Sequence, residues 1–256
     1  LEIALYDIDP QRLDDSDRLI RALNEKYNEG KAVIKSYLGV ENRKEALRGA
    51  DFVINAIQVG GYEPCTVIDF EIPKKYGLRQ TIADTLGIGG IFRALRTIPV
   101  LDDFAKDMMQ VCPNAWFLNY TNPMCMVTSY LHHLGVEAMG LCHSVQGTSA
   151  MLAKWIGAKM SDVTYKCAGI NHQAFFLEYK VNGEDAYPRI YEAIKNPDIY
   201  KSEAVRIEMM KGLGYFVTES SGHNSEYNAW FRKRQDLIDK YVPDSYATSI
   251  RTITDR

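Results

Sequence analysis

The chain opens with Leu1-Glu2-Ile3-Ala4-Leu5-Tyr6-Asp7-Ile8-Asp9-Pro10, an apolar run that ends in acidic residues. Pro10 then begins a helical pattern of apolar residues that extends to about Glu29. A strand that ends in a carboxylate and leads into a helix is typical of the second strand of a dinucleotide-binding fold, where the acid binds the adenosine ribose. We therefore expect Asp7 to bind a dinucleotide, while Asp9 caps the helix.

Apolar strands continue to alternate with helical segments over the next hundred residues. The pattern predicts strands at 32–34, 51–57 and 116–118 and helices at 42–47, 66–76 and 91–111. This alternation favours an α/β fold with a doubly wound, parallel sheet of the Rossmann type, as in lactate and malate dehydrogenases, and it predicts that the 51–57 strand is buried.

Ligands of such sheets bind outside the carboxyl ends of the strands. Asn55, Gln58 and Asn119 follow two of the predicted strands and are candidate cofactor-binding residues. Three glycines among residues 87–90 precede the 91–111 helix. They would let backbone amides approach an anionic ligand, or they form an ordinary loop.

Two short apolar runs end abruptly in residues that can hold a metal or move a proton. The first ends in Gly140-Leu141-Cys142-His143-Ser144 and the second in Gly169-Ile170-Asn171-His172-Gln173. A thiolate and an imidazole on two neighbouring strand ends could form half of a divalent-metal shell and leave positions open for a substrate. The alternative is that Cys142 is a small buried residue and His172 a core histidine.

The pattern changes after the second run. We expect a helix at 145–156, two strands within 163–179 that flank His172, and longer helices beyond Tyr187. The segment Gly214–Tyr227 is too polar for a core and is either part of a site or a capping loop before a helix. We expect a dinucleotide-binding domain at 1–142 and a substrate- and metal-binding domain at 143–256.

Composition sets limits on the function. The chain has 256 residues, 46% hydrophobic content and a net charge of −3, as an ordinary globular protein does. The 30 Lys and Arg are outnumbered by 33 Asp and Glu, which argues against nucleic acid as a partner. No apolar stretch suits a membrane span or a signal peptide, and five cysteines suit free thiols in a reducing compartment, so we expect a cytoplasmic protein.

Six motifs follow one another along the chain, namely Leu5–Asp9, Asp84–Gly87, Gly89–Pro99, Asn119–Pro123, Gly140–Ser144 and Gly169–His172. Together they resemble the motifs of glycoside hydrolase family 4, and two segments, residues 142–148 and 218–221, resemble its α-galactosidase (melibiase) branch. The resemblance covers essentially the whole chain. It implies that the family's N-terminal glycine-rich strand and a long C-terminal part are absent, so that the chain is a fragment beginning in mid-strand.

By this resemblance, the protein uses NAD and a divalent metal, usually Mn²⁺, and does not use a pair of catalytic carboxylates. NAD would oxidise the C3 hydroxyl of the sugar, and a tyrosine would remove the proton from C2. The aglycone would then leave by elimination, water would add, and the ketone would be reduced again. The expected substrate is a small α-galactoside, and the expected assembly is a homo-oligomer, either dimer or tetramer.

The resemblance also implies roles for particular residues. Cys142 and His172 match the metal ligands, Asn122 matches a substrate-binding residue, and Asp84 matches a carboxylate that raises the basicity of the tyrosine. Further candidates for contact with the substrate are Asn119, Arg93, Glu219 and His223.

The tyrosine and the acid stay open. Tyr227 and Tyr215 could both be the base, and the polar surroundings of Tyr227 favour it. Where the phosphoglucosidase branch has a proton-donating Asp after the Cys, this chain has His143. Either His143 donates the proton, or Glu219 or His223 does.

Two other classes remain. A 2-hydroxy-acid dehydrogenase would share the fold and could use Arg93 and Arg96 for the substrate carboxylate, but it needs no metal-binding cysteine. A dinucleotide-sensing module without activity would leave Cys142, His172 and Asp84 unexplained. Within the family, α-glucosidase and α-galacturonidase specificities are alternatives.

Overall fold

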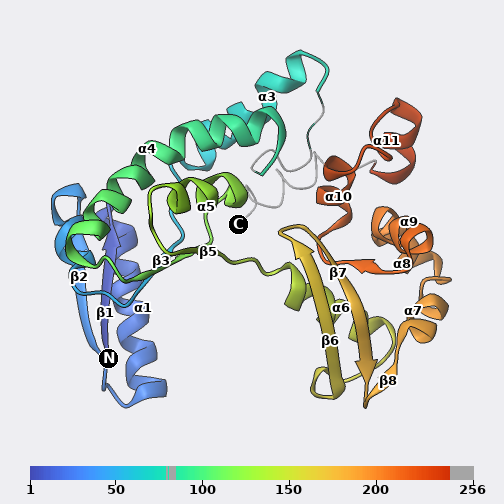
Figure 1. Ribbon diagram of the computed structural model, residues 1–256, viewed down its shortest axis with the longest axis horizontal. Coiled ribbons are helices and arrows are strands. Elements are labelled where there is room, and N and C mark those ends of the chain that lie inside the picture. The colour runs from blue at the N-terminus through green and yellow to red at the C-terminus, as the bar shows by residue number, and fades with distance from the viewer. Residues whose placement is uncertain (79, 81–84, 243–256) are drawn as a thin grey trace. The chain divides into compact units, whose positions relative to one another are not determined.

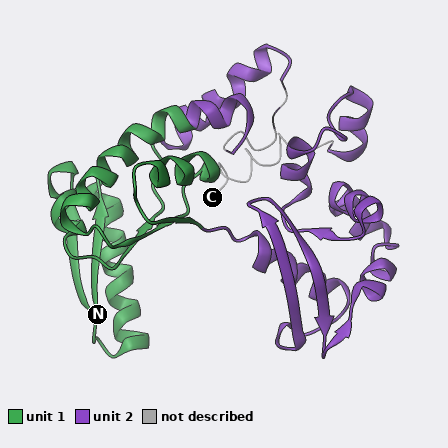
Figure 2. Cartoon of the chain, viewed as in Figure 1, with its two compact units in different colours: residues 1–59, 94–140 green, residues 60–93, 141–256 purple. Residues whose placement is uncertain are grey.

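The structure is a computed structural model that describes residues 1–78, 80 and 85–242. It forms two compact units, coloured separately in Figure 2. Unit 1 comprises Leu1–Val59 and Ala94–Gly140, and unit 2 comprises Gly60–Arg93 and Leu141–Arg256. Among the described helices, none has the length and apolar character that crossing a bilayer requires.

Unit 1 carries two parallel sheets, β1–β2 and β3–β4–β5, with helices between the strands (Figure 1). These parallel pairings confirm the predicted α/β organisation of the first half of the chain. Its elements are β1 (Glu2–Asp7), α1 (Pro10–Asn28), β2 (Val33–Leu38), the turn η1 (Val40–Asn42), α2 (Arg43–Leu47), β3 (Phe52–Asn55), most of α4 (Gly87–Val111), β4 (Trp116–Asn119), α5 (Met124–His133) and β5 (Ala138–Gly140).

The core of unit 1 forms where α4 packs on the strands. Leu101, Phe104, Ala105 and Met108 recur at helical spacing on one face of α4, and all four are buried. They meet Phe117 of β4, which has no exposed surface. The glycines that precede this face do not form a separate loop, because α4 already begins at Gly87.

A parallel strand lies within residues 51–57, as predicted, but the prediction that this strand is buried was wrong. β3 pairs in parallel with β4, but Phe52 is 65% and Ile54 is 71% exposed. Successive side chains of a strand point to opposite faces. The described elements cover the face that carries Val53 and Asn55 and leave the other face open.

Unit 2 is built on an antiparallel sheet in the order β6–β7–β8, with β9 also paired to β7. Its mixed α and β composition agrees with the predicted second half. Its elements are the turn η2 (Gly61–Thr66), α3 (Val67–Lys75), the start of α4, α6 (Ser144–Trp155), the turn η3 (Met160–Asp162), β6 (Val163–Ile170), β7 (Gln173–Val181), β8 (Glu184–Asp185), α7 (Tyr187–Ala193), α8 (Pro197–Ser202), α9 (Ala204–Leu213), β9 (Phe216–Val217), α10 (Ser221–Tyr227) and α11 (Gln235–Tyr241).

The long hairpin of β6 and β7 supports the core of unit 2 (Figure 1). Phe176 and Tyr179 of β7 are fully buried against Leu152 of α6 and Ile207 of α9. Gly169 permits the close approach of the two strands, because a Cβ at that position would lie 2.4 Å from the carbonyl oxygen of Gln173. The two predicted strands that flank His172 are therefore confirmed.

Two predictions about the end of the chain were wrong. The helices beyond Tyr187 are short, from 6 to 10 residues in α7 to α11, because turns and β9 interrupt them. The polar segment Gly214–Tyr227 also contributes to the interior. Phe216 and Val217 pair with β7. Asn224 and Ser225 have no exposed surface, and their side chains can be buried because they donate hydrogen bonds to the carbonyl oxygens of Glu219 and Gly222.

Candidate metal centre

Three potential metal donors of different chemistry meet within unit 2. They are the thiol sulfur of Cys142, an imidazole nitrogen of His172 and a carboxylate oxygen of Glu219, and all three atoms lie within 4.8 Å of one another. Cys142 Sγ is 3.4 Å from His172 Nε2, which is 3.2 Å from Glu219 Oε2. The remaining separation, from Sγ to Oε2, is 3.9 Å.

Each donor stands where a regular element starts or ends. Cys142 lies between β5 and α6, Glu219 lies between β9 and α10, and His172 occupies the two-residue turn between β6 and β7. Cys142 and His172 follow the ends of two strands that belong to different sheets, β5 to the parallel sheet of unit 1 and β6 to the antiparallel sheet of unit 2.

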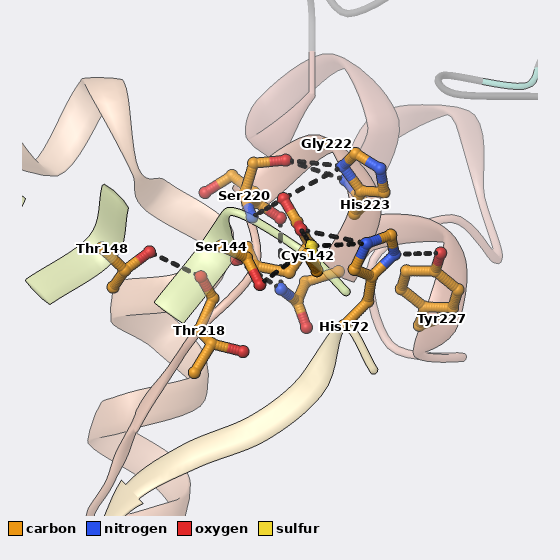
Figure 3. Close-up of polar contacts among 12 residues, drawn as sticks. Cys142, Ser144, Thr148, His172, Thr218, Ser220, Gly222, His223 and Tyr227 are labelled. Carbon is orange, nitrogen blue, oxygen red and sulfur yellow. Dashed lines mark hydrogen bonds and ion pairs between the residues drawn. The ribbon is translucent and has the colours of Figure 1, made fainter. Parts of the chain in front are cut away.

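His172 has a backbone conformation that most side chains avoid. Its φ is +62°, in the left-handed region that a tight turn between two strands demands and that glycine usually supplies. The side chain is nevertheless 5% exposed and points into the cluster shown in Figure 3. A strained, buried imidazole with polar neighbours indicates a functional position.

The spacing of the donors fits a single cation. Three ligand atoms at bonding distance from one transition-metal ion lie about 3.0–3.8 Å apart, and the observed separations are 3.2, 3.4 and 3.9 Å. One thiolate, one imidazole and one carboxylate form a donor set for a divalent transition metal. Three protein ligands leave further positions for substrate oxygens, as a catalytic centre requires.

The Cys142 thiol has the ionisation of a metal ligand. Burial raises its pKa, but hydrogen bonding with His172 and with Ser144 outweighs the burial, and the pKa falls from 9.0 to about 7. Ser144 Oγ lies 3.4 Å from the sulfur (Figure 3). The thiolate, which binds metals, is therefore accessible near neutral pH.

Tyr227 contacts the second nitrogen of the His172 imidazole. Its hydroxyl oxygen lies 2.8 Å from His172 Nδ1, on the side opposite to the nitrogen that faces Cys142 and Glu219 (Figure 3). A hydrogen bond to the second ring nitrogen fixes the tautomer and orientation of a metal-binding histidine. Of the two candidate tyrosines, Tyr227 lies in the cluster, whereas the half-exposed Tyr215 packs against Tyr187.

His223 and Ser220 orient the Glu219 carboxylate. The amide of Ser220 donates to Glu219 Oε1 at 2.7 Å, and His223 Nδ1 lies 3.3 Å from the same oxygen. Ser220 is also the N-cap of α10, because its hydroxyl accepts from the amide of His223. One carboxylate oxygen is thus held by the start of α10, and the other faces Cys142 and His172.

From the sequence, Glu219 and His223 were expected to be substrate contacts or acids, and Glu219 was not expected to be a metal donor. A signal was present, since Thr218-Glu219-Ser220-Ser221 puts an acid directly before an N-capping serine. His143, the other candidate acid, is exposed and stands at the start of α6, beside Cys142 in the chain.

The candidate cofactor residues lie in unit 1. Asn55 and Asn119 are opposite each other at the carboxyl ends of β3 and β4, where the side-chain Nδ2 of Asn55 donates to Asn119 Oδ1 at 2.8 Å. Asp7 ends β1, and its carboxylate accepts two hydrogen bonds from the Arg12 guanidinium, which lowers its pKa. Asp9 caps α1 by accepting from the amide of Arg12, as predicted.

The other candidates lie on different elements of the chain. Gln58 is exposed after β3, Asn122 is half-buried between β4 and α5, and Arg93 is half-buried in α4. Asp84 lies outside the residues that the structure describes.

Comparisons with known proteins show the family of the chain. The model of family 4 glycosyl hydrolases matches residues 1–158, and the model of the C-terminal domain of the same family matches residues 167–255. The chain is 55% identical to an alpha-galactosidase of Bacillus subtilis (strain 168) over 91% of its length, and 38% identical to an alpha-galactosidase of Rhizobium meliloti (strain 1021) over 94%.

A solved structure has the same fold. The 6-phospho-beta glucosidase from Thermotoga maritima, crystallised with manganese, NAD⁺ and glucose-6-phosphate, matches with a TM-score of 0.73 and 24% identity, over 98% of this chain and 58% of that one. The chain spans about half the length of the curated relatives it matches, 54% and 49% for the two alpha-galactosidases. On the two family matches, which together cover most of its residues, the chain belongs to glycosyl hydrolase family 4.

Proposed function

We propose that the complete protein is a glycoside hydrolase that depends on NAD and Mn²⁺ and acts on α-galactosides. The observation that carries this proposal is the meeting of Cys142, His172 and Glu219, a donor set that suits a divalent metal. The identity to two alpha-galactosidases supports the specificity, and the manganese and NAD⁺ bound to the Thermotoga maritima enzyme support the cofactors.

The two cofactors divide the chemistry between them. When bound, NAD would accept a hydride from the carbon that bears a sugar hydroxyl, and the divalent cation would supply a Lewis acid. We assign the cation to Cys142, His172 and Glu219. We assign NAD to Asp7, Asn55, Gln58 and Asn119.

The chain supplies the proton transfers and the orientation. We assign Tyr227 as the base that takes the proton from C2 of the sugar, because it is the candidate tyrosine that contacts a proposed metal ligand, with its hydroxyl oxygen 2.8 Å from His172 Nδ1. His143, exposed and adjacent to Cys142, is the proposed acid for the departing oxygen. Asn122, Asn119 and Arg93, with His223, are the proposed contacts to the sugar, and Asp84 the carboxylate that supports the base.

Hydrolysis of nitrophenyl glycosides tests the proposal. We expect the full-length protein to cleave the α-galactoside faster than the α-glucoside or the α-galacturonide, and to lose activity when NAD, Mn²⁺ or the thiol reductant is omitted. Full activity without metal, or oxidation of a 2-hydroxy acid in place of hydrolysis, would favour the dehydrogenase alternative.

The isotope content of the product tests the base. Removal of the C2 proton and its return from solvent should place deuterium at C2 of galactose released in deuterated water. Product without deuterium at C2 would exclude the assignment of Tyr227.

We also propose that the protein is cytoplasmic, that it forms a homo-oligomer, either dimer or tetramer, and that its binding partner is its substrate, a small glycoside. The location is supported by the five cysteines, which are all unpaired by disulfides in the structure. Sedimentation of the full-length protein would measure the oligomeric state.

A further inference from the structure

An ion pair between the buried Arg206 and the partly buried Glu203 lies next to the segment that carries Glu219. Arg206 of α9 is 4% exposed, and its guanidinium binds both oxygens of the Glu203 carboxylate at 2.6 and 2.7 Å. The guanidinium carbon also lies 5.2 Å above the ring of Phe216. Such a pair is a weak source of stability, because desolvation of the two charges offsets most of their attraction.

Each member of the pair is linked by hydrogen bonds to a residue near Glu219 in the chain, Arg206 to the preceding Thr218 and Glu203 to Ser221. Arg206 Nη1 donates to Thr148 Oγ1 at 2.8 Å, and Thr148 Oγ1 donates to the carbonyl oxygen of Thr218 at 2.5 Å (Figure 3). On the other side, Ser221 Oγ donates to Glu203 Oε2 at 2.9 Å.

The contacts therefore bracket a single backbone segment. Thr218 directly precedes Glu219, and Ser221 follows it by two residues. Thr218 is also fixed to the sheet, because its amide donates to the carbonyl of Ala174 in β7. Between these fixed points the carboxylate of Glu219 has its oxygen 3.2 Å from His172 Nε2.

We infer that the Arg206–Glu203 pair, acting through Thr148 and Ser221, positions Glu219 as the third ligand of the metal centre. This inference rests on the proposed metal-dependent function. It adds positioning residues that do not touch the metal or the substrate. Removal of a group that hydrogen-bonds a metal ligand directly weakens metal binding by about 10- to 100-fold, and these residues, which act through the chain neighbours of the ligand, should reach the lower end of that range.

Thr148→Val is the central test variant, because valine keeps the shape of threonine and removes only the hydroxyl that links Arg206 to Thr218. In the full-length protein we expect its dissociation constant for Mn²⁺, measured by titration, to rise about tenfold. Thr148→Ser restores a hydroxyl and should recover the wild-type constant.

A second variant, which destabilises the core of the same unit without touching the contacts of Thr148, separates a loss of positioning from a general loss of stability. Ile190→Val shortens a fully buried core side chain in α7 of the same unit. It should lower the melting temperature without changing the Mn²⁺ dissociation constant. Equal loss of affinity in Ile190→Val and Thr148→Val, at equal melting temperature, would overturn the inference.

A double-mutant cycle tests whether the effect passes through Glu219. If it does, Thr148→Val should change the Mn²⁺ constant by less than about twofold once Glu219→Gln is present. A further tenfold loss in the double variant would overturn the inference.

The wild-type protein separates this inference from the proposed function. Mn²⁺ binding without glycoside hydrolysis would remove the proposed function and leave the positioning inference standing. Mn²⁺ binding and hydrolysis with Thr148→Val indistinguishable from wild type would remove only the inference. A wild-type protein that binds no divalent metal would overturn both.

Discussion

His172 combines a donor nitrogen with a backbone conformation that favours glycine. Its φ of +62° lets the turn join β6 to β7, and its ring then faces Cys142 on one side and Tyr227 on the other. The positive φ therefore lowers the stability of the backbone at this position, and it places the imidazole between Cys142 and Tyr227.

Substitution of His172 should separate these two effects. We expect both His172→Gly and His172→Ala to lose Mn²⁺ binding, because neither has a donor atom. The glycine variant should be the more stable of the two by about 1 kcal/mol, since alanine retains the strain at positive φ. Denaturant unfolding measures the difference. A more stable alanine variant would contradict the strain, and retained Mn²⁺ affinity in either would contradict the ligand assignment.

Cys142 predicts how metal binding depends on pH. The metal binds the thiolate, so protons compete with it below the pKa of about 7, and apparent affinity should fall by about tenfold per pH unit there. Above that pKa the thiolate is already formed, and the contribution of Cys142 should level off. Mn²⁺ titrations from pH 6 to 9 measure this curve. A break close to 9 would show that the contacts with His172 and Ser144 do not stabilise the thiolate.

At the scale of elements, the β6–β7 hairpin sets the position of His172. Close packing at Gly169 brings the strands together next to the turn, where a Cβ would lie 2.4 Å from the Gln173 carbonyl oxygen and 2.5 Å from Ala174 Cα. Both atoms belong to the backbone of β7, so they can move only if the hairpin opens.

We expect Gly169→Ala to destabilise unit 2 by about 1–3 kcal/mol, as overpacking does, and to weaken Mn²⁺ binding because the turn shifts. Gly183→Ala is the matched control. It also has a positive φ, +84°, but a Cβ there meets nothing within 4 Å, so only the backbone cost of about 1 kcal/mol should remain. Thermal unfolding and Mn²⁺ titration measure both effects. Equal behaviour of the two variants would exclude the steric explanation.

At the scale of the whole molecule, the donors belong to one compact unit. Cys142, His172 and Glu219 all lie in unit 2, and Asn55 and Asn119 lie in unit 1. The two cofactors should therefore stabilise different parts of the protein.

Calorimetry of the full-length protein tests this division. Mn²⁺ at about 100 times its dissociation constant adds about 2.7 kcal/mol to the part that binds it. We expect it to raise the unfolding transition of unit 2, and a chelator to reverse the shift, while NAD raises the transition of unit 1. A Cys142→Ser/His172→Gly variant should lose only the response to Mn²⁺. A response to Mn²⁺ in that variant would place the ion elsewhere.

The sequence alone determined the order and type of most elements. Strand β1 with its terminal Asp7, helix α1 and the hairpin around His172 follow from apolar periodicity and turn residues, which act over a few positions. The same local patterns identified Cys142 and His172. They failed for β3, because exposure of Phe52 and Ile54 depends on which elements cover each face and not on the strand's own residues.

Only the tertiary structure decided the rest of the centre. Glu219 lies 77 residues from Cys142 along the chain, and Tyr227 lies 55 from His172. Their meeting depends on how β9 pairs with β7 and how α9 packs beneath α10, and no local period encodes either. From the sequence alone, Glu203 and Arg206 are three residues apart, as in an ordinary ion pair on a helix surface. The role of this pair comes from burial against Thr148 and Ser221, because hydrogen bonds act over a few ångströms in space whatever the separation in the chain.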